Sequence, residues 1–131
     1  MSLAAVVRDD FSAPFFDAAA DGRLLLRYSP GSDAWSDPSA LVCSTTQAQD
    51  LEWREASGTG QLVSWTVKPG RPRDGVATPD TVIGIVELDE GPWLTLWLPE
   101  ADPATLTVGG PVEVDFVQPE GSEHLPVGRL A

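Results

Sequence analysis

The sequence predicts a mainly β protein in which a short N-terminal helix and a ribbon-like segment precede a small barrel. Three observations support this fold class. From Leu51 onward apolar residues tend to alternate with polar ones, as in half-buried strands. A helix signal stands only near the N-terminus, and a turn-rich Ser/Pro/Gly/Asp/Thr segment follows it. We therefore divide the chain into an arm and helix (1–23), a ribbon (24–52) and a barrel (53–131).

Residues 1–9 show no clear period and are predicted to form a loose arm. The helix is predicted over 13–21, because Ser12 can cap its start and Gly22 stands where a helix would end. Its two phenylalanines are adjacent, which is more than one buried face needs. Both could pack onto the body of the protein. Alternatively, one of them meets a partner, since large exposed aromatic residues mark interfaces.

A strand over 24–28 should lead into the turn-rich part of the ribbon. Ser29 and Ser32 are separated by two residues, as are Cys43 and Thr46, and this is the spacing of two zinc-ribbon knuckles. Zinc needs thiolate or imidazole donors, and three of the four positions lack them. We therefore expect no zinc here.

Without a metal, the ribbon must be held by other interactions, and we expect apolar packing to supply them. Trp35 should plug the small core that zinc would have organised. The other apolar residues expected to hold the ribbon are Leu41, Val42 and Leu51. Cys43 has no neighbouring base in the sequence, so we interpret it as a small buried residue rather than a nucleophile.

The remaining chain predicts about five short strands with glycine-rich corners. In the first of them Val63, Trp65 and Val67 are expected to form the buried face. A short helical turn beginning at Pro103 falls between the third and fourth strands, as in an OB-type barrel. The predicted strands span 61–68, 81–89, 93–98, 112–117 and 125–130.

The strand 93–98 is apolar on both faces, because Trp93 and Trp97 alternate with leucines. A barrel strand ordinarily shows one face to water. The second face must then be covered, either by the helix and ribbon or by a partner subunit. A homodimer is a separate possibility for the assembly of the chain.

Charge limits the function. Twenty acidic and eight basic residues give a net charge of -12, which argues against binding nucleic acid. The N-terminus lacks signal-peptide features and no apolar run reaches the ~20 residues of a spanning helix, so we expect a cytoplasmic protein without a membrane segment. The lone His124 and the absence of a nucleophile motif argue against independent catalysis.

Three cations, Lys68, Arg71 and Arg73, crowd the loop KPGRPRDG of this acidic chain. They could meet an anionic group such as the phosphates of coenzyme A. The alternative is a solvated loop whose charges keep it soluble.

The runs PFFDAAADGRLLLRY, DLEWREASGTGQLVSWTV, IGIVELDEG and LTVGGPVEVDF, in this order, resemble the acyl-CoA-associated OB-fold proteins that begin with a helix and a rubredoxin-like zinc ribbon. The resemblance covers about residues 11–129. It implies the fold, and it matches the two Cys-x-x-Cys knuckles of the family to Ser29/Ser32 and Cys43/Thr46. It also implies an accessory role beside thiolase-like enzymes, a steroid side-chain aldolase or acyl-CoA hydratases, rather than the nucleic-acid binding once ascribed to such proteins.

Our leading hypothesis is a non-catalytic accessory protein for a thiolase-like or related acyl-CoA enzyme of lipid or polyketide metabolism. The alternative is a module that binds an acyl-CoA or another small ligand through Lys68, Arg71 and Arg73. The residues expected to contact a partner are Phe15, Phe16, Trp35, Trp93 and Trp97.

Overall fold

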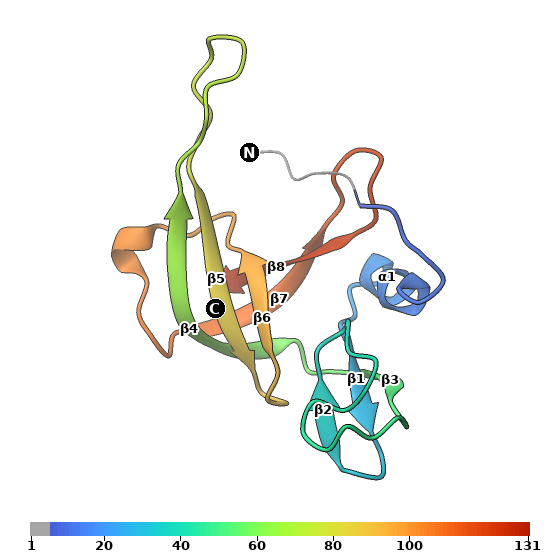
Figure 1. Cartoon of the computed structure of the whole chain (residues 1–131). Coiled ribbons are helices and arrows are strands. Elements are labelled where there is room, and N and C mark those ends of the chain that lie inside the picture. Colours follow the sequence, from blue (N-terminus) through green and yellow to red (C-terminus); the bar gives the residue numbers. More distant parts are fainter. Residues whose placement is uncertain (1–5) are drawn as a thin grey trace.

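A computed structural model of the chain describes residues 6–131 as one helix, a small open sheet and a closed barrel (Figure 1). No helix in this range is long and apolar enough to cross a membrane. The elements are, in chain order, α1 (Ala13–Ala20), β1 (Leu25–Ser29), β2 (Ala34–Ser36), β3 (Glu52–Glu55), β4 (Thr59–Lys68), β5 (Thr81–Leu88), β6 (Trp93–Trp97), the 3-10 turn η1 (Pro103–Thr105), β7 (Pro111–Val117) and β8 (Leu125–Leu130).

Helix α1 forms where it was predicted and packs against β1 and β8. Ser12 is the N-cap residue, but its side chain accepts a hydrogen bond from the Asp9 N–H (3.0 Å) instead of capping the helix. Gly22 follows the helix with a φ of 75°, a conformation that glycine adopts without strain. Its N–H donates to the Ala19 carbonyl (3.0 Å) and so closes the last turn.

The arm before α1 is tied to the barrel by the loop that joins β7 to β8. The Val6 N–H donates to Ser122 Oγ (2.8 Å), and the Val6 carbonyl accepts from the Glu123 N–H (3.0 Å). Arg8 forms ion pairs with Glu123 (2.7 Å) and Asp17 (2.5 Å). The prediction of a loose arm is therefore wrong from Val6 onward, and its earlier part lies outside the described residues.

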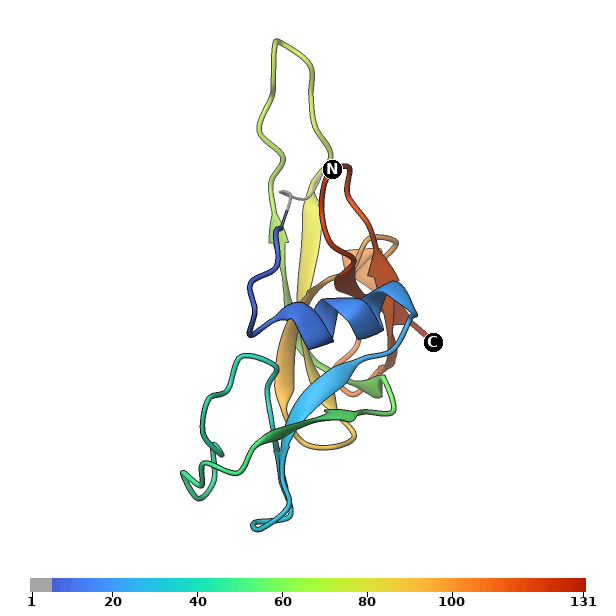
Figure 2. The same cartoon turned by 90° about the vertical axis from the view of Figure 1, so that its right-hand side faces the viewer.

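The ribbon is an antiparallel sheet with the strand order β2-β1-β3. Arg27 in β1 stands opposite Ser36 on one side and Trp53 on the other. Because β3 pairs with β1 as far as Glu55, the ribbon sheet extends beyond the predicted boundary at residue 52. Figure 2 shows α1 lying across the end of this sheet that is nearer the barrel.

The barrel closes in the order β4-β5-β6-β8-β7, which confirms the predicted OB-type fold. The turn η1 lies between β6 and β7, the third and fourth barrel strands, as predicted. Its start is capped by Asp102, whose Oδ1 accepts from the Ala104 N–H (3.0 Å). The barrel is closed by a parallel contact between β6 and β8 at Trp97 and Val127.

Strand β4 departs from the strict alternation expected of it. A bulge between Leu62 and Ser64 shifts the register against β5. Leu62, before the bulge, is fully buried, whereas Val63, at the bulge, and Trp65, beyond it, are half-buried. Val67 is 38% exposed, so the prediction that all three residues of this face are buried is wrong at Val67.

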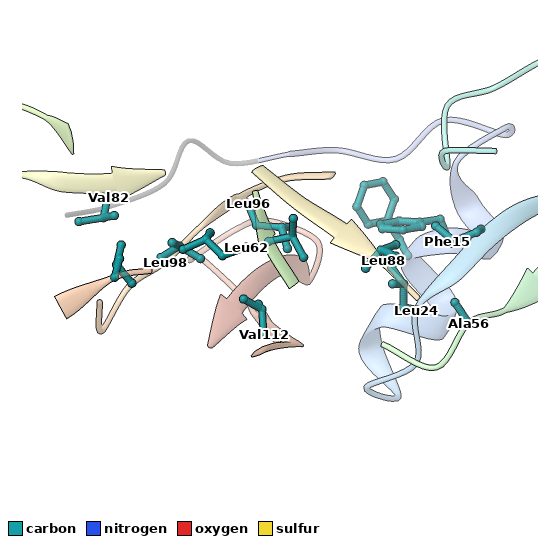
Figure 3. Close-up of a cluster of buried hydrophobic side chains, with 13 residues drawn as sticks. Phe15, Leu24, Ala56, Leu62, Val82, Leu88, Leu96, Leu98 and Val112 are labelled. Carbon is teal, nitrogen blue, oxygen red and sulfur yellow. The ribbon is translucent and has the colours of Figure 1, made fainter. Parts of the chain in front are cut away.

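One apolar core links the barrel to the helix and to the start of the ribbon (Figure 3). Leu62, Leu98 and Val112 fill the barrel, and Phe15 and Leu24 continue the cluster toward α1. A Cβ atom on Gly84 would lie 2.8 Å from Leu98 Cδ1, so the missing side chain leaves room for the leucine. The helix and barrel are thus held in place by shared burial.

Candidate interaction sites

The four vestigial ligand positions meet at the tip of the ribbon. Ser32 Oγ lies 2.7 Å from Thr46 Oγ1, and the Ser32 N–H donates to Ser29 Oγ (3.2 Å). The Cys43 side chain is fully buried beside them. A hydrogen bond from the Thr46 side chain is the main cause that lowers the pKa of the Cys43 thiol below its ordinary value. The structure thus brings these four side chains together.

Asp50 completes this cluster, and sequence reasoning missed it. Its carboxylate accepts from the Ser29 hydroxyl (2.6 Å) and from the Gly31 N–H (2.8 Å). These two bonds, that of Ser29 first, lower the pKa of Asp50 below its ordinary value of 3.8. Among so many acidic residues, nothing in the sequence distinguished this one.

The donors of the cluster do not fit zinc. One thiol, one carboxylate and three hydroxyls are a poor set for the ion, since hydroxyls stay protonated at neutral pH while structural zinc selects thiolate and imidazole. Within residues 6–131, no group of three or more His, Cys, Asp and Glu side chains is arranged to hold a metal. Absence of zinc from the purified protein remains a prediction.

Hydrogen bonds, rather than the expected apolar residues, hold much of the ribbon loop. Leu41 is 72% exposed and Val42 is 40% exposed, so the prediction that they pack inside the ribbon is wrong. The loop is instead fastened by the Ser44 N–H, which donates to the buried Ser36 hydroxyl (3.1 Å). Trp35 does pack, half-buried, with its ring edge toward Tyr28 at a centroid distance of 5.1 Å.

Phe15 and Phe16 do not offer a surface to a partner. Each is only 8% exposed, and their rings contact one another edge to face at 5.3 Å within the core. Their prediction as contact residues is therefore corrected to a packing role. The exposed ring in this region belongs to Phe11, which the sequence reading did not single out.

Trp93 and Trp97 lie on the outer face of the barrel. Trp93 is 56% exposed, and its indole N–H donates to Glu87 (2.9 Å). Trp97 is half-buried opposite Ile83 of β5. Because Val82 and Val86 point into the core, Ile83 and its neighbour Ile85 face outward. This outer face therefore keeps apolar surface that the helix does not fully cover.

A second aromatic group surrounds Arg27 at the junction of ribbon and helix. The guanidinium carbon lies 4.7 Å from the centroid of the Trp53 ring and 5.3 Å from that of Phe11. The two rings are 5.6 Å apart and tilted. The arginine also donates to the carbonyls of Ala40 (3.3 Å) and Leu51 (3.4 Å). We call Phe11, Arg27 and Trp53 the arginine cluster.

The predicted basic loop forms the tip of a long β4–β5 hairpin that projects from the barrel (Figure 1). Lys68, Arg71 and Arg73 line one hollow of about 360 Å³ between its arms. The structure thus brings the three predicted cations together. A Cβ atom on Gly70 would lie 2.2 Å from the Thr78 carbonyl oxygen, so glycine is needed where the two arms approach.

Most cations outside this hairpin are neutralised by carboxylates. Within residues 6–131, the three hairpin cations and Arg27 form no ion pair with a carboxylate. The arginines that do form such pairs are Arg8, Arg23, Arg54 and Arg129.

The fold defines a class of OB-barrel proteins that carry a ribbon and a helix in front of the barrel. The sequence matches the family described as "ChsH2, C-terminal OB-fold domain" over residues 53–117. A solved structure described as "Ltp2-ChsH2(DUF35) aldolase" superposes with a TM-score of 0.76 at 30% identity, covering 98% of both chains. The chain therefore belongs to the ChsH2 (DUF35) family of OB-fold proteins.

Two further relatives extend the comparison. A protein of Thermomonospora curvata named "Probable enoyl-CoA hydratase alpha subunit" is 32% identical over 127 residues, which are 97% of this chain and 39% of that protein. The chain thus spans about two fifths of the length of this curated relative. A DUF35 protein of unknown function from Sulfolobus solfataricus shares the fold, with a TM-score of 0.63 at 10% identity.

Proposed function

We propose that the chain is a non-catalytic accessory subunit of an acyl-CoA enzyme, either a thiolase-like enzyme or a related aldolase or hydratase. The observation that carries this proposal is the end-to-end similarity to a chain of a structure whose description joins Ltp2 and ChsH2 in an aldolase. A second relative is named as a subunit of an enoyl-CoA hydratase.

The surface of the chain supports a role in assembly. Trp93 and Leu41 are strongly exposed, and the outer face of β5 and β6 carries Ile83 and Ile85. Exposed aromatic and aliphatic groups of this kind favour protein interfaces. The single cysteine is fully buried, and this lack of access argues against its use as a nucleophile.

The test is co-expression with the thiolase-like, aldolase and hydratase subunits of the same host, followed by size-exclusion chromatography with light scattering. We expect a stoichiometric complex, and we expect the isolated chain to be inactive toward acyl-CoA substrates. Elution of the two proteins as separate species, with the enzyme fully active without this chain, would contradict the proposal.

A second candidate function is binding of a CoA thioester, favoured by the unpaired cations of the hairpin hollow. The phosphates of the ligand would lie against Lys68, Arg71 and Arg73, whose charges no carboxylate of residues 6–131 neutralises. Calorimetry with acetyl-CoA and a longer acyl-CoA tests this. Replacing all three cations by Gln should abolish the heat of binding.

The matched control for that experiment replaces Arg23 and Arg54, which already have carboxylate partners, by Gln. These changes also make the chain more acidic but leave the hollow intact, so binding should persist. Equal loss in both variants would show that only the overall charge matters. Absence of heat with the unaltered chain would remove this second function.

A further inference from the structure

Arg27 is the one cation outside the basic hairpin that lacks a carboxylate partner within residues 6–131. This is unusual for the molecule, since acidic residues outnumber basic ones by twenty to eight. The ring of Trp53 and the ring of Phe11 lie beside the guanidinium, at 4.7 Å and 5.3 Å. The charge is therefore held by aromatic faces rather than by an anion.

The hydrogen bonds of Arg27 use only some of its N–H groups, so others remain available to donate to a ligand or partner. A guanidinium has five N–H donors. In residues 6–131, Nε and Nη2 each make one bond to a carbonyl, and both bonds are long, at 3.3 Å and 3.4 Å. The side chain is half-buried, so the remaining donors sit in an environment where a charged acceptor is worth more than in open water.

The surroundings of Arg27 are exposed and apolar. The carbonyl that accepts its Nε–H belongs to Ala40, directly before Leu41 (72% exposed) and Val42 (40% exposed). Phe11, one of the two rings beside the guanidinium, is 37% exposed. Figure 2 shows the chain before α1 descending toward the ribbon loop. Aromatic residues and arginine flanked by aliphatic side chains make up the energetic centre of many protein interfaces.

We propose that the arginine cluster, flanked by Leu41 and Val42, docks an acidic side chain of the partner enzyme, with the partner's carboxylate hydrogen-bonded to Arg27. This inference rests on the proposed function and assigns part of its interface. A carboxylate matches the planar fork of the guanidinium, and the tilted rings keep that fork oriented before the partner arrives. The aliphatic pair supplies apolar area around the ion pair and excludes water from it.

The experiment measures affinity for the enzyme subunit that forms the complex in the co-expression test. Arg27→Gln should raise Kd by about 30-fold or more, the size of effect expected for an arginine at the centre of an interface. The matched control is Arg54→Gln. Arg54 also stacks on a ring, Tyr28 at 3.8 Å, but it is paired with Glu52 (2.7 Å) and faces the other side of the same sheet. The Arg54→Gln variant should therefore change Kd by less than about threefold.

Two additional variants separate docking from folding. Arg27→Lys keeps the charge without the fork, and Leu41→Ser alters a side chain that is mostly in solvent. Both should weaken binding while the melting temperature stays close to that of the unaltered chain. If Arg27→Gln fails to fold, these two variants decide the matter, and unchanged binding in both overturns the inference.

The charge-reversed variant Arg27→Glu identifies the occupant. It should abolish the complex, and a single Asp or Glu to Arg substitution on the partner should restore it. A folded Arg27→Gln variant with unchanged affinity would overturn the docking role while leaving the accessory function standing. If the unaltered chain forms no complex, the accessory function fails first and the inference falls with it.

Discussion

Asp50 accepts hydrogen bonds that hold the first predicted knuckle of the ribbon. In a zinc ribbon, two knuckles are joined because four side chains bind one ion. Here the Ser29 hydroxyl and the Gly31 N–H of the first knuckle both donate to the Asp50 carboxylate, and Ser32 meets Thr46 directly. The two predicted knuckles thus meet through a hydrogen bond between hydroxyls, weaker than a zinc–thiolate bond, while Asp50 ties the first knuckle to the end of the ribbon loop.

We predict that Asp50→Ala destabilises the protein by about 1–3 kcal/mol, because the fully buried Ser29 hydroxyl loses its acceptor. Urea unfolding followed by tryptophan fluorescence measures this. The control is Gln49→Ala, a neighbouring exposed residue, which should change the unfolding free energy by less than about 0.5 kcal/mol. Equal stability of the two variants would show that Asp50 does not hold the ribbon.

The burial of a single side chain was predictable only where the chemistry of the residue argued against an exposed role. Cys43 is buried as expected, since a lone cysteine without a base behaves as a small apolar residue. Leu41 and Val42 are apolar as well, yet they are exposed, because the hydroxyl and carboxylate network already holds the loop around them. Apolarity alone does not say whether a loop residue points inward.

The secondary-structure elements were largely predictable, and their irregularities were not. The five barrel strands follow from apolar alternation or from apolar runs between turn residues, and the turn at Pro103 follows from the residues around it. The bulge in β4 leaves no sequence signal, since Leu62 and Val63 are both apolar and either could face the core. The short strands β2 and β3 were also missed, because three and four residues are too few to show a period.

At the level of the ribbon, the proximity of the four predicted ligand positions gives a prediction about metal. Replacing Ser29, Ser32 and Thr46 together by Cys should create a four-thiolate site that binds one zinc ion and raises the melting temperature. Cobalt substitution with absorption spectroscopy would report tetrahedral thiolate coordination. The unaltered protein should contain no stoichiometric zinc and should be insensitive to a chelator. A triple variant that remains metal-free would show that the four positions are not arranged around one point.

For the whole molecule, several carboxylates link stability to pH. Hydrogen bonds from Arg8 lower the pKa of Glu123 below its ordinary 4.5, and those from Arg129 lower the pKa of Asp115 below 3.8. A carboxyl whose pKa is lower in the folded state contributes stability above its unfolded pKa and loses it as the pH falls through the folded value.

We therefore expect these carboxylates to contribute fully from neutral pH down to about 4.5 and the melting temperature to fall steeply below 3.8. Differential scanning calorimetry across this range measures the effect. Arg8→Gln, which removes the cause of the Glu123 shift, should make the decline shallower. A decline of the same steepness would assign acid sensitivity to other groups, such as Asp50.

The closure of the barrel has a mechanical consequence. In residues 6–131, β6 and β8 are in register only at Trp97 and Val127, whereas β7 and β8 pair along their whole length. Between β6 and β8 the barrel is therefore held by a single pair of residues, Trp97 and Val127. Because separation of β6 from β8 breaks only this one pairing, the amide hydrogens near Trp97 and Val127 should exchange with solvent before those of β5. We therefore expect local opening of the barrel to begin between β6 and β8, while the paired strands β7 and β8 remain together.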